Sequence, residues 1–248
     1  MAAHERARRA GRRSLLGAAA GALFFPPLFP ARAATPPLPP PFPAVPESGA
    51  LTFRIVREGL MIGTQALTFT PPGSVKPDPH KPKTLRLTVR IFTEVTFKPT
   101  PLTLYQFSGT LIEEWDGGKL HGFTAESVEN GIHRRLRGER GPGGSLWVKG
   151  PLGRLAVPPD AIPATFWNPQ CLDSPLIDPI FGRVLTVQVA DRGMTRIEIA
   201  NGSELDVHAF ALSGDFPAEL WYVEQPARRF AGMRRPGGDG VPLVYELL

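Results

Sequence analysis

Alternation of apolar and polar side chains between Thr84 and Lys98 constrains the fold of this chain more than any other pattern. Apolar side chains take one set of alternate positions, at Leu85, Leu87, Val89, Ile91, Val95 and Phe97. Polar side chains fill most of the other set, at Arg86, Thr88, Arg90, Glu94, Thr96 and Lys98. A period of two residues is typical of a strand with one buried face. The segment therefore predicts a half-buried β-strand.

Shorter alternating segments extend this pattern in both directions. We expect strands at 51–58, 61–70, 84–98, 102–115, 119–129, 132–140, 146–149 and 152–157, and again at 183–190, 195–200, 205–212, 219–223, 229–234 and 241–247. Asp116-Gly117-Gly118 and Asn130-Gly131 separate such segments, and these residues favour tight hairpins because their backbones tolerate positive φ. No helical pattern of ten or more residues separates the strands, which argues against a parallel sheet with a nucleotide-binding crevice.

The number of strands predicts a curved sheet, because a large, strongly twisted open sheet tends to curl or close. We predict a single all-β domain over 49–248, built on a large, strongly curved antiparallel sheet that forms a half-barrel or barrel. A proline-rich crossover at 158–182 interrupts the strands, and its prolines exclude a long helix. At most one short helical turn fits there, around 165–167. We expect this crossover to lie over the mouth or edge of the sheet.

The N-terminal residues 1–33 have the pattern of a signal peptide, with a basic region, the apolar run Leu15–Phe25 and small residues before a cleavage site near Ala33. Arg12 and Arg13 precede the apolar run and match the twin-arginine export signal. We therefore expect recognition by the twin-arginine export machinery and a periplasmic or secreted location. The apolar run is too short to span a bilayer, which needs about 20 residues, so we expect no stable membrane anchor. Residues 34–48 are proline-rich and predict a disordered tether.

Charge is concentrated in this leader. Residues 1–33 hold six of the 28 Lys and Arg residues and one of the 23 Asp and Glu residues, so 22 of each sign remain in the rest of the chain. Nucleic-acid binding depends on clustered basic residues. The neutral balance beyond the leader therefore gives no support for a nucleic-acid partner.

Large aromatic residues in the crossover are the strongest candidates for a binding site. Phe166, Trp167 and Asn168 lie in a loop stiffened by prolines, and loops over a rigid sheet often carry function. They either line a cavity or plug the core. Tyr105 and Trp221 complete the candidate set, although Trp221 and its neighbour Tyr222 point to opposite sides of their strand. The ligand we expect is an apolar or amphipathic small molecule.

Cys171 is the only cysteine, which excludes an intramolecular disulfide and makes it the candidate nucleophile of an alternative, a hydrolase. His121, His133 or His208 would then supply the base and Asp173 or Asp178 would orient it. A lone cysteine is more often a small buried apolar residue, so we predict no catalytic residue. The histidines lack short-range ligand pairs, and we predict neither a metal nor a cofactor.

Glu113, Glu114 and Asp116 surround Trp115, a composition that resembles carbohydrate sites with paired carboxylates. Glu113 and Glu114 are adjacent on a strand and face opposite sides, so only one of them can enter a given cavity. A solvated strand end is the simpler interpretation.

Four segments carry a resemblance to a known family: Ile55–Thr64, Glu114–Gly118, Pro163–Pro169 and Gly214–Tyr222. With them the chain resembles an uncharacterised family of exported bacterial proteins, domain of unknown function 6134, over about residue 51 to the C-terminus. The resemblance implies a secreted β-rich domain and no catalytic residues. The strand pattern is also loosely similar to periplasmic curved-sheet carriers of lipids and lipoproteins.

These observations predict a non-catalytic binding or carrier module of the cell envelope. Two alternatives stay open at this point: the Cys171 hydrolase, and an envelope assembly factor that pairs a free sheet edge with a partner strand.

Overall fold

The computed structural model describes residues 44–71, 87–98 and 104–248. These residues belong to one compact unit over Leu38–Leu248. The expected leader at 1–33, with Arg12 and Arg13, lies outside the described residues, as does most of the expected tether. Residues 84–86 of the expected strand 84–98 lie outside them as well.

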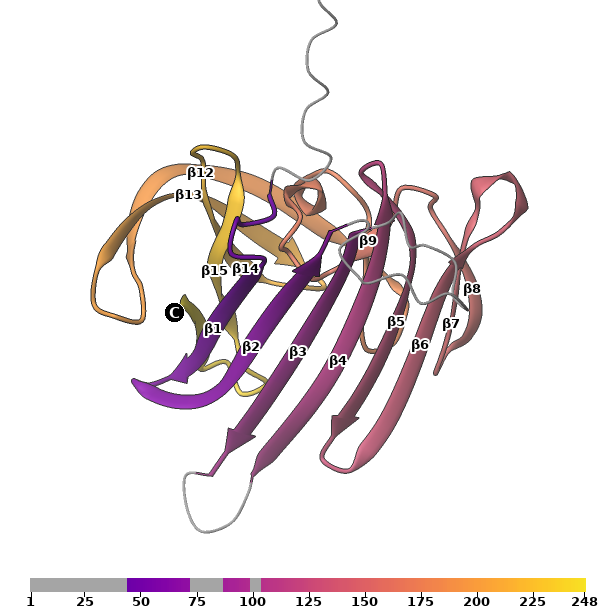
Figure 1. Ribbon diagram of the computed structural model, residues 1–248. Coiled ribbons are helices and arrows are strands. Elements are labelled where there is room, and N and C mark those ends of the chain that lie inside the picture. The colour runs from indigo at the N-terminus through magenta and orange to yellow at the C-terminus, as the bar shows by residue number, and fades with distance from the viewer. Residues whose placement is uncertain (1–43, 72–86, 99–103) are drawn as a thin grey trace, which may run out of the picture. The chain divides into compact units, whose positions relative to one another are not determined.

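Strands make up most of the described residues, in agreement with the two-residue alternation of the sequence (Figure 1). The elements are β1 (Ala50–Arg57), β2 (Leu60–Thr70), β3 (Leu87–Phe97), β4 (Tyr105–Asp116), β5 (Lys119–Glu129), β6 (Ile132–Arg140), the 3₁₀ turn η1 (Pro142–Gly144), β7 (Leu146–Gly150), β8 (Gly153–Val157), β9 (Ile162–Pro163), the 3₁₀ turn η2 (Pro169–Leu172), β10 (Leu176–Ile177), β11 (Val184–Leu185), β12 (Val187–Glu198), β13 (Glu204–Gly214), β14 (Ala218–Val223), β15 (Arg229–Pro236) and β16 (Pro242–Leu247).

Thirteen of the described strands form one sheet in the order β12-β13-β14-β15-β16-β1-β2-β3-β4-β5-β6-β7-β8. Every neighbouring pair in it is antiparallel, and β1 pairs with β16, so the two ends of the domain meet in the middle of the sheet. The sheet is open, with β12 and β8 at its edges. Figure 1 shows β12 and β13 turned across the direction of β2–β6. The predicted all-β fold with a large curved antiparallel sheet is confirmed.

Turn chemistry follows the sequence closely at the predicted hairpins. Asn130 and Gly131 both have positive φ, 47° and 82°, at the turn between β5 and β6.

The region around Gly193 differs from the prediction of separate strands at 183–190 and 195–200. The structure has one strand, β12, with a register shift between Asp191 and Gly193. Gly193 has φ 76° and donates its amide to the Asp191 carboxylate at 2.7 Å, so a local β-bulge replaces the expected break.

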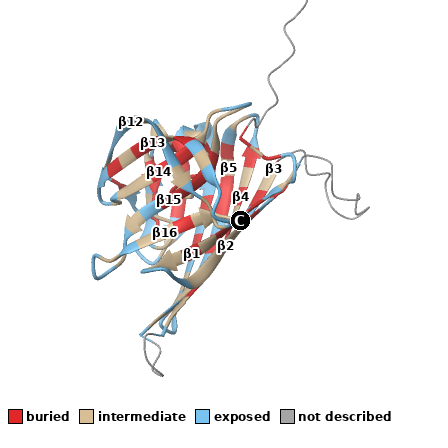
Figure 2. Ribbon diagram, turned by 90° about the vertical axis from the view of Figure 1, so that its left-hand side faces the viewer, coloured by how far each residue is buried: buried red, intermediate tan, exposed pale blue. Residues whose placement is uncertain are grey.

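The sheet has two faces with separate apolar clusters. The main cluster lies on what we call the inner face, which carries Phe53, Val89, Leu111 and Phe230, and it includes the crossover. A smaller cluster of Val207, Ala209, Trp221 and Ala231 lies on the outer face of β13–β15. The amide of Ala200 donates to Leu247 O at 3.0 Å, which brings the β12–β13 turn to the end of β16. Strands β12–β16 thus coil far enough to enclose a small core of their own. Figure 2 shows buried residues both around β3–β5 and around β13–β15.

The crossover lies against the inner face, where its buried residues belong to the main cluster. Two short strands of the crossover, β9 and β10, form a separate small sheet with β11, which follows the crossover, in the order β11-β10-β9. The short helical element is η2 at Pro169–Leu172 instead of the expected 165–167. Phe166 explains this difference, because its φ of 63° is left-handed and incompatible with a helical turn.

Candidate functional site

Glu113 attaches the crossover to the sheet. The side chain lies on the inner face of β4 and is fully buried. Its Oε2 atom accepts hydrogen bonds from the indole Nε1 atoms of Trp115 and Trp167, each at 2.8 Å. Its Oε1 atom accepts from Thr165 Oγ1 at 2.7 Å. One carboxyl group therefore connects β4 to two residues of the crossover.

Burial raises the pKa of Glu113, and the three hydrogen bonds oppose that shift. The interpretation of Glu113 as a solvated strand end is therefore wrong. Adjacent strand residues face opposite sides, and here the inner side is covered by the crossover. Glu114, on the other face, is half-buried. The two carboxyl groups do not share a cavity, which removes the basis for a carbohydrate site.

Trp167 fills the space beside Glu113 as a plug of the core. Its ring packs edge-on against Trp115 with centroids 5.5 Å apart, and against Phe69 at 5.3 Å. Only 1% of Trp167 is exposed. Asn168 follows it and is used locally, because its side-chain oxygen accepts the amide of Gln170 at 3.1 Å and caps η2.

Phe166 lies between two residues that are held by Glu113, and its backbone is strained by the positive φ. Its carbonyl oxygen accepts a hydrogen bond from the Tyr222 hydroxyl at 2.8 Å. Its ring packs against Phe216 with centroids 5.0 Å apart. The crossover is thus fixed from β4 on one side and from β14 on the other, which holds the Phe166 ring at the wall of a cavity.

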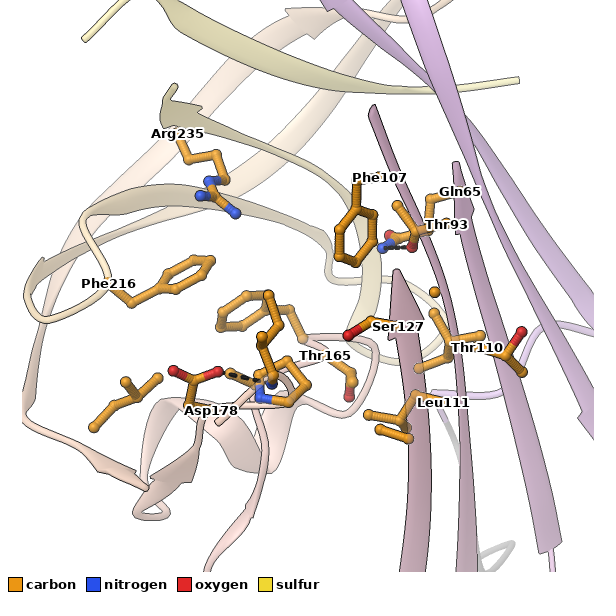
Figure 3. A pocket seen from close by; sticks show the side chains of 18 of the residues that line it. Gln65, Thr93, Phe107, Thr110, Leu111, Ser127, Thr165, Asp178, Phe216 and Arg235 are labelled. Atoms are coloured by element: carbon orange, nitrogen blue, oxygen red, sulfur yellow. Dashed lines mark hydrogen bonds between the residues drawn. The ribbon is translucent and has the colours of Figure 1, made fainter. Parts of the chain in front are cut away.

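This first cavity has a volume of about 270 Å³ and lies between the inner face and the crossover. Strands β3, β4 and β5 supply Thr93, Leu111 and Ser127 on one side, and Phe216 and Arg235 lie on the other (Figure 3). Gln65 donates to the Thr93 hydroxyl at 3.1 Å, so polar groups of this wall are partly satisfied.

A second cavity of about 470 Å³ adjoins the first. Both cavities are lined by Thr93, Phe107, Ile180, Arg235 and Tyr245. Tyr105, Val95 and Leu243 belong to the second cavity alone. We call the two adjoining cavities the inner cleft. Combined apolar walls and a few polar groups are the features of small-molecule sites, which commonly have volumes of about 300–1,000 Å³.

Tyr105 contributes a hydroxyl that donates to Glu129 at 3.2 Å. Burial, and the negative charge of Glu129, raise the pKa of Tyr105 to about 12. The tyrosine is therefore neutral at physiological pH. Glu129 also pairs with Arg134 at 3.0 Å, so its charge is already balanced.

The predicted binding residues thus separate into three groups. Phe166 and Tyr105 line the inner cleft. Trp167 and Asn168 are buried structural residues beside it. Trp221 does not join the cleft, because strand alternation places it on the outer face, where its indole donates to Glu219 at 3.2 Å. Its neighbour Tyr222 occupies the inner side instead.

Cys171 lies on η2 and is 2% exposed. Its sulfur is 3.2 Å from the Tyr222 hydroxyl oxygen. Because that hydroxyl donates its proton to Phe166 O, the thiol must be the donor to Tyr222. Burial raises the pKa of Cys171 to about 12.

The histidines expected to activate this thiol lie elsewhere. His208 lies between Asp191 at 2.6 Å and Glu224 at 3.0 Å. His133 is exposed, and His121 lines a pocket that does not include Cys171. Among the described residues, no histidine forms a hydrogen bond with Cys171. The hydrolase alternative therefore lacks both its thiolate and its base.

The described residues contain no group of three or more His, Cys, Asp and Glu side chains that could hold a metal ion. In the same part of the chain, no helix has the length and apolar character needed to cross a membrane.

The family model described as domain of unknown function (DUF6134) matches residues 53–247. The chain belongs to the DUF6134 family. This confirms the resemblance drawn from the sequence. The chain is also similar to the crystal structure of a β-barrel-like protein of domain of unknown function DUF1849 from Brucella abortus, with a TM-score of 0.50 and 12% identity. That match covers 80% of this chain and 94% of the other, and it shows the fold alone. No curated protein matches the chain.

In this DUF6134 chain, two of the segments that carried the family resemblance meet at Glu113. Trp115 belongs to one, and Thr165 and Trp167 belong to the other. The sequence contained a signal for this residue, because Glu113 falls at an alternate position between Leu111 and Trp115, on the apolar face of its strand. A carboxyl group at such a position predicts a buried partner set.

Removing the carboxyl group should destabilise the fold strongly. Glu113→Ala leaves two buried indole donors unsatisfied and should lower the free energy of unfolding by about 3–5 kcal/mol. Glu113→Gln should lower it by less than about 1.5 kcal/mol, because the amide oxygen can accept both indoles while the amide nitrogen donates to Thr165. Urea unfolding measures both, with Glu114→Gln as the control on the outer face. Equal stability of Glu113→Ala and the wild type would contradict this role.

Stability should also depend on pH through Glu113. Its pKa is raised in the folded state, so the folded protein binds this proton more tightly than the unfolded chain does. The resulting stabilisation is complete below the unfolded value of about 4.3 and is lost as pH rises through the folded value. In urea unfolding between about pH 4 and pH 8, the stability of the wild type relative to Glu113→Gln should therefore fall as pH rises. A pH-independent difference would exclude a raised pKa.

Cys171 should behave as a buried structural thiol. At about pH 8 the folded protein should react very slowly with a disulfide reagent such as 5,5′-dithiobis(2-nitrobenzoate), since little thiolate exists and the sulfur is buried. Unfolding in urea should release one rapidly reacting thiol. Fast labelling of the folded protein, measured by absorbance, would contradict the burial of this thiol.

Proposed function

We propose that this protein is a non-catalytic module that binds an apolar or amphipathic small molecule in the cell envelope. The inner cleft carries this proposal. It lies between the curved sheet and a crossover that is fixed by Glu113 and Tyr222, so its wall is preformed. A preformed apolar cleft binds without a large loss of conformational entropy.

The lining of the cleft is suited to a molecule with a long apolar part. Ile91, Leu111 and Met233 line the first cavity, and Val95 and Leu243 line the second. Removing such a surface from water supplies the binding free energy, at about 25 cal/mol per Å² of apolar area. The side chains that interrupt this surface are hydroxyls, one amide, three guanidinium groups and five carboxylates, and they would orient a polar end.

The proposed location follows from the expected leader. Arg12 and Arg13 would direct export by the twin-arginine machinery, and cleavage near Ala33 would release the domain into the periplasm or medium. An apolar molecule dissolves poorly in such an aqueous compartment. A soluble domain with an apolar cleft would carry it there.

Strand addition at a sheet edge has weaker support in the described structure. Strand β12 is an edge strand and exposes Met194 and Val189. It also contains the bulge at Asp191 and the charged Arg192 and Arg196, all of which are features that prevent pairing with other chains. The inner cleft is therefore the better-supported site.

Filling the cleft should weaken binding without unfolding the protein. Thr93 lines both cavities, and Thr93→Phe should weaken binding of the neutral fluorophore N-phenyl-1-naphthylamine by at least about tenfold, since overpacking costs about 1–3 kcal/mol. Thr88→Phe, on the other face of β3, is the matched control and should change the affinity by less than about twofold.

Fluorescence titration measures the affinity, and thermal unfolding followed by circular dichroism verifies that each variant is folded. Native mass spectrometry of protein purified from its own envelope would identify a retained ligand. A folded wild-type protein that binds no apolar probe would contradict the proposed function.

A further inference from the structure

Arg235 lies where the two cavities of the inner cleft adjoin. It belongs to β15, is half-buried, and lines both cavities. Figure 3 shows it on the same side as Phe216, across the cavity from Thr93 and Phe107. A guanidinium in this position interrupts a wall that is otherwise mostly apolar.

Every other charged side chain that lines the cleft has a partner of opposite charge within the protein. Arg57 pairs with Asp239 at 2.5 Å. Arg183 lies 3.6 Å from both Asp178 and Asp215. The two glutamates of the lining also have partners, in the pairs Arg134–Glu129 and Arg135–Glu126. Each carboxylate of the lining therefore already has an arginine partner, although Asp178 and Asp215 share Arg183.

Arg235 differs from these residues because none of the ion pairs among the described residues includes it. Its guanidinium carbon lies 5.0 Å from the centroid of the Phe216 ring, and its other close neighbour is Tyr245. By contrast, the preceding Arg234 faces the other side of β15 and pairs with Glu219 at 2.6 Å. A partly desolvated cation without an anionic partner is unfavourable, which points to an anion supplied from outside the chain.

Tyr245 adds a second donor beside this cation. Its hydroxyl is buried, and burial raises its pKa although Arg235 opposes the shift. The hydroxyl therefore keeps its proton at physiological pH. Together, Arg235 and Tyr245 present N–H and O–H donors at the junction of two apolar cavities.

We propose that Arg235 binds the single anionic oxygen headgroup of an amphiphile whose aliphatic chain lies in the inner cleft. This inference rests on the proposed function and specifies its ligand class. The planar guanidinium donates two parallel hydrogen bonds to a carboxylate or a phosphate. One cation without an ion pair among the described residues matches one headgroup of this kind, and the apolar walls on both sides of Arg235 accommodate the chain.

The test compares three ligands of equal chain length, each below its critical micelle concentration: dodecanoate, dodecyl phosphate and the neutral dodecan-1-ol. Isothermal titration calorimetry with the purified protein should show at least one anion binding tenfold or more tighter than the alcohol, since a charge-assisted pair is worth about 10- to 100-fold. Whichever anion binds more tightly assigns the headgroup.

Variants then locate the effect at Arg235. Arg235→Gln should weaken binding of the preferred anion by about 10- to 100-fold and change the affinity for dodecan-1-ol by less than about threefold. Arg235→Lys should restore part of the selectivity, because it keeps the charge and loses the planar fork. Arg196→Gln, on exposed β12, is the matched control and should leave all three affinities unchanged. Thermal unfolding verifies that each variant is folded.

Two results would overturn this inference and leave the proposed function intact: equal affinity of the wild type for alcohol and anions, or an equal loss for all three ligands in Arg235→Gln. Failure of the wild type to bind any of the three would instead overturn the proposed function together with the inference.

Discussion

The buried carboxyl group of Glu113 is the interaction on which the rest of this structure depends. A large open sheet must cover its inner face, and the only described segment that does so here is rich in proline, which cannot donate backbone hydrogen bonds. Side chains therefore take over the attachment. Glu113 accepts hydrogen bonds from Thr165 and Trp167 of the crossover, and the Trp167 ring fills the space beneath it.

The position of this attachment along β4 explains where the cleft lies. Inward-facing residues of β4 run from Tyr105 through Gly109 to Glu113 and Trp115. The Glu113 end is plugged by Trp167, whereas the Tyr105 end lines the second cavity. Gly109 lines the first cavity between them, and a Cβ there would lie 2.9 Å from the Phe107 ring. The missing side chain therefore leaves room for the Phe107 ring, which lines both cavities.

The sequence was sufficient for the strands and hairpins because these depend on local chemistry. Alternation around Val89 and the positive φ of Asn130 are examples in which neighbouring residues alone decide the structure. Gly193 shows the limit of such reasoning, since a glycine that suggests a turn here makes a bulge within one strand. Bulge and turn have similar local requirements, and cross-strand pairing decides between them.

The candidate site was harder to predict because it depends on which face of each strand is enclosed. Alternation showed that Trp221 and Tyr222 point to opposite sides, but it does not say which side the crossover covers. Tyr105 and Phe166 were predicted as binding residues and line the cleft. The roles of Arg235 and Glu113 depend instead on which side chains surround them in the folded protein. Ion pairing is a tertiary property, so a sequence cannot show that Arg235 has no carboxylate partner among the described residues.

Glu113 and Arg235 illustrate two different uses of a charged side chain on one inner face. Glu113 is fully buried and has three donors from its own chain, so its hydrogen-bonding capacity is used within the fold. Arg235 is half-buried and has aromatic neighbours in place of a carboxylate. A group whose partners are all internal stabilises the structure, while a cation without an ion pair among the described residues has its charge available for a ligand. The same physical requirement, that a desolvated polar group finds a partner, thus distinguishes the attachment of the crossover from the proposed binding site.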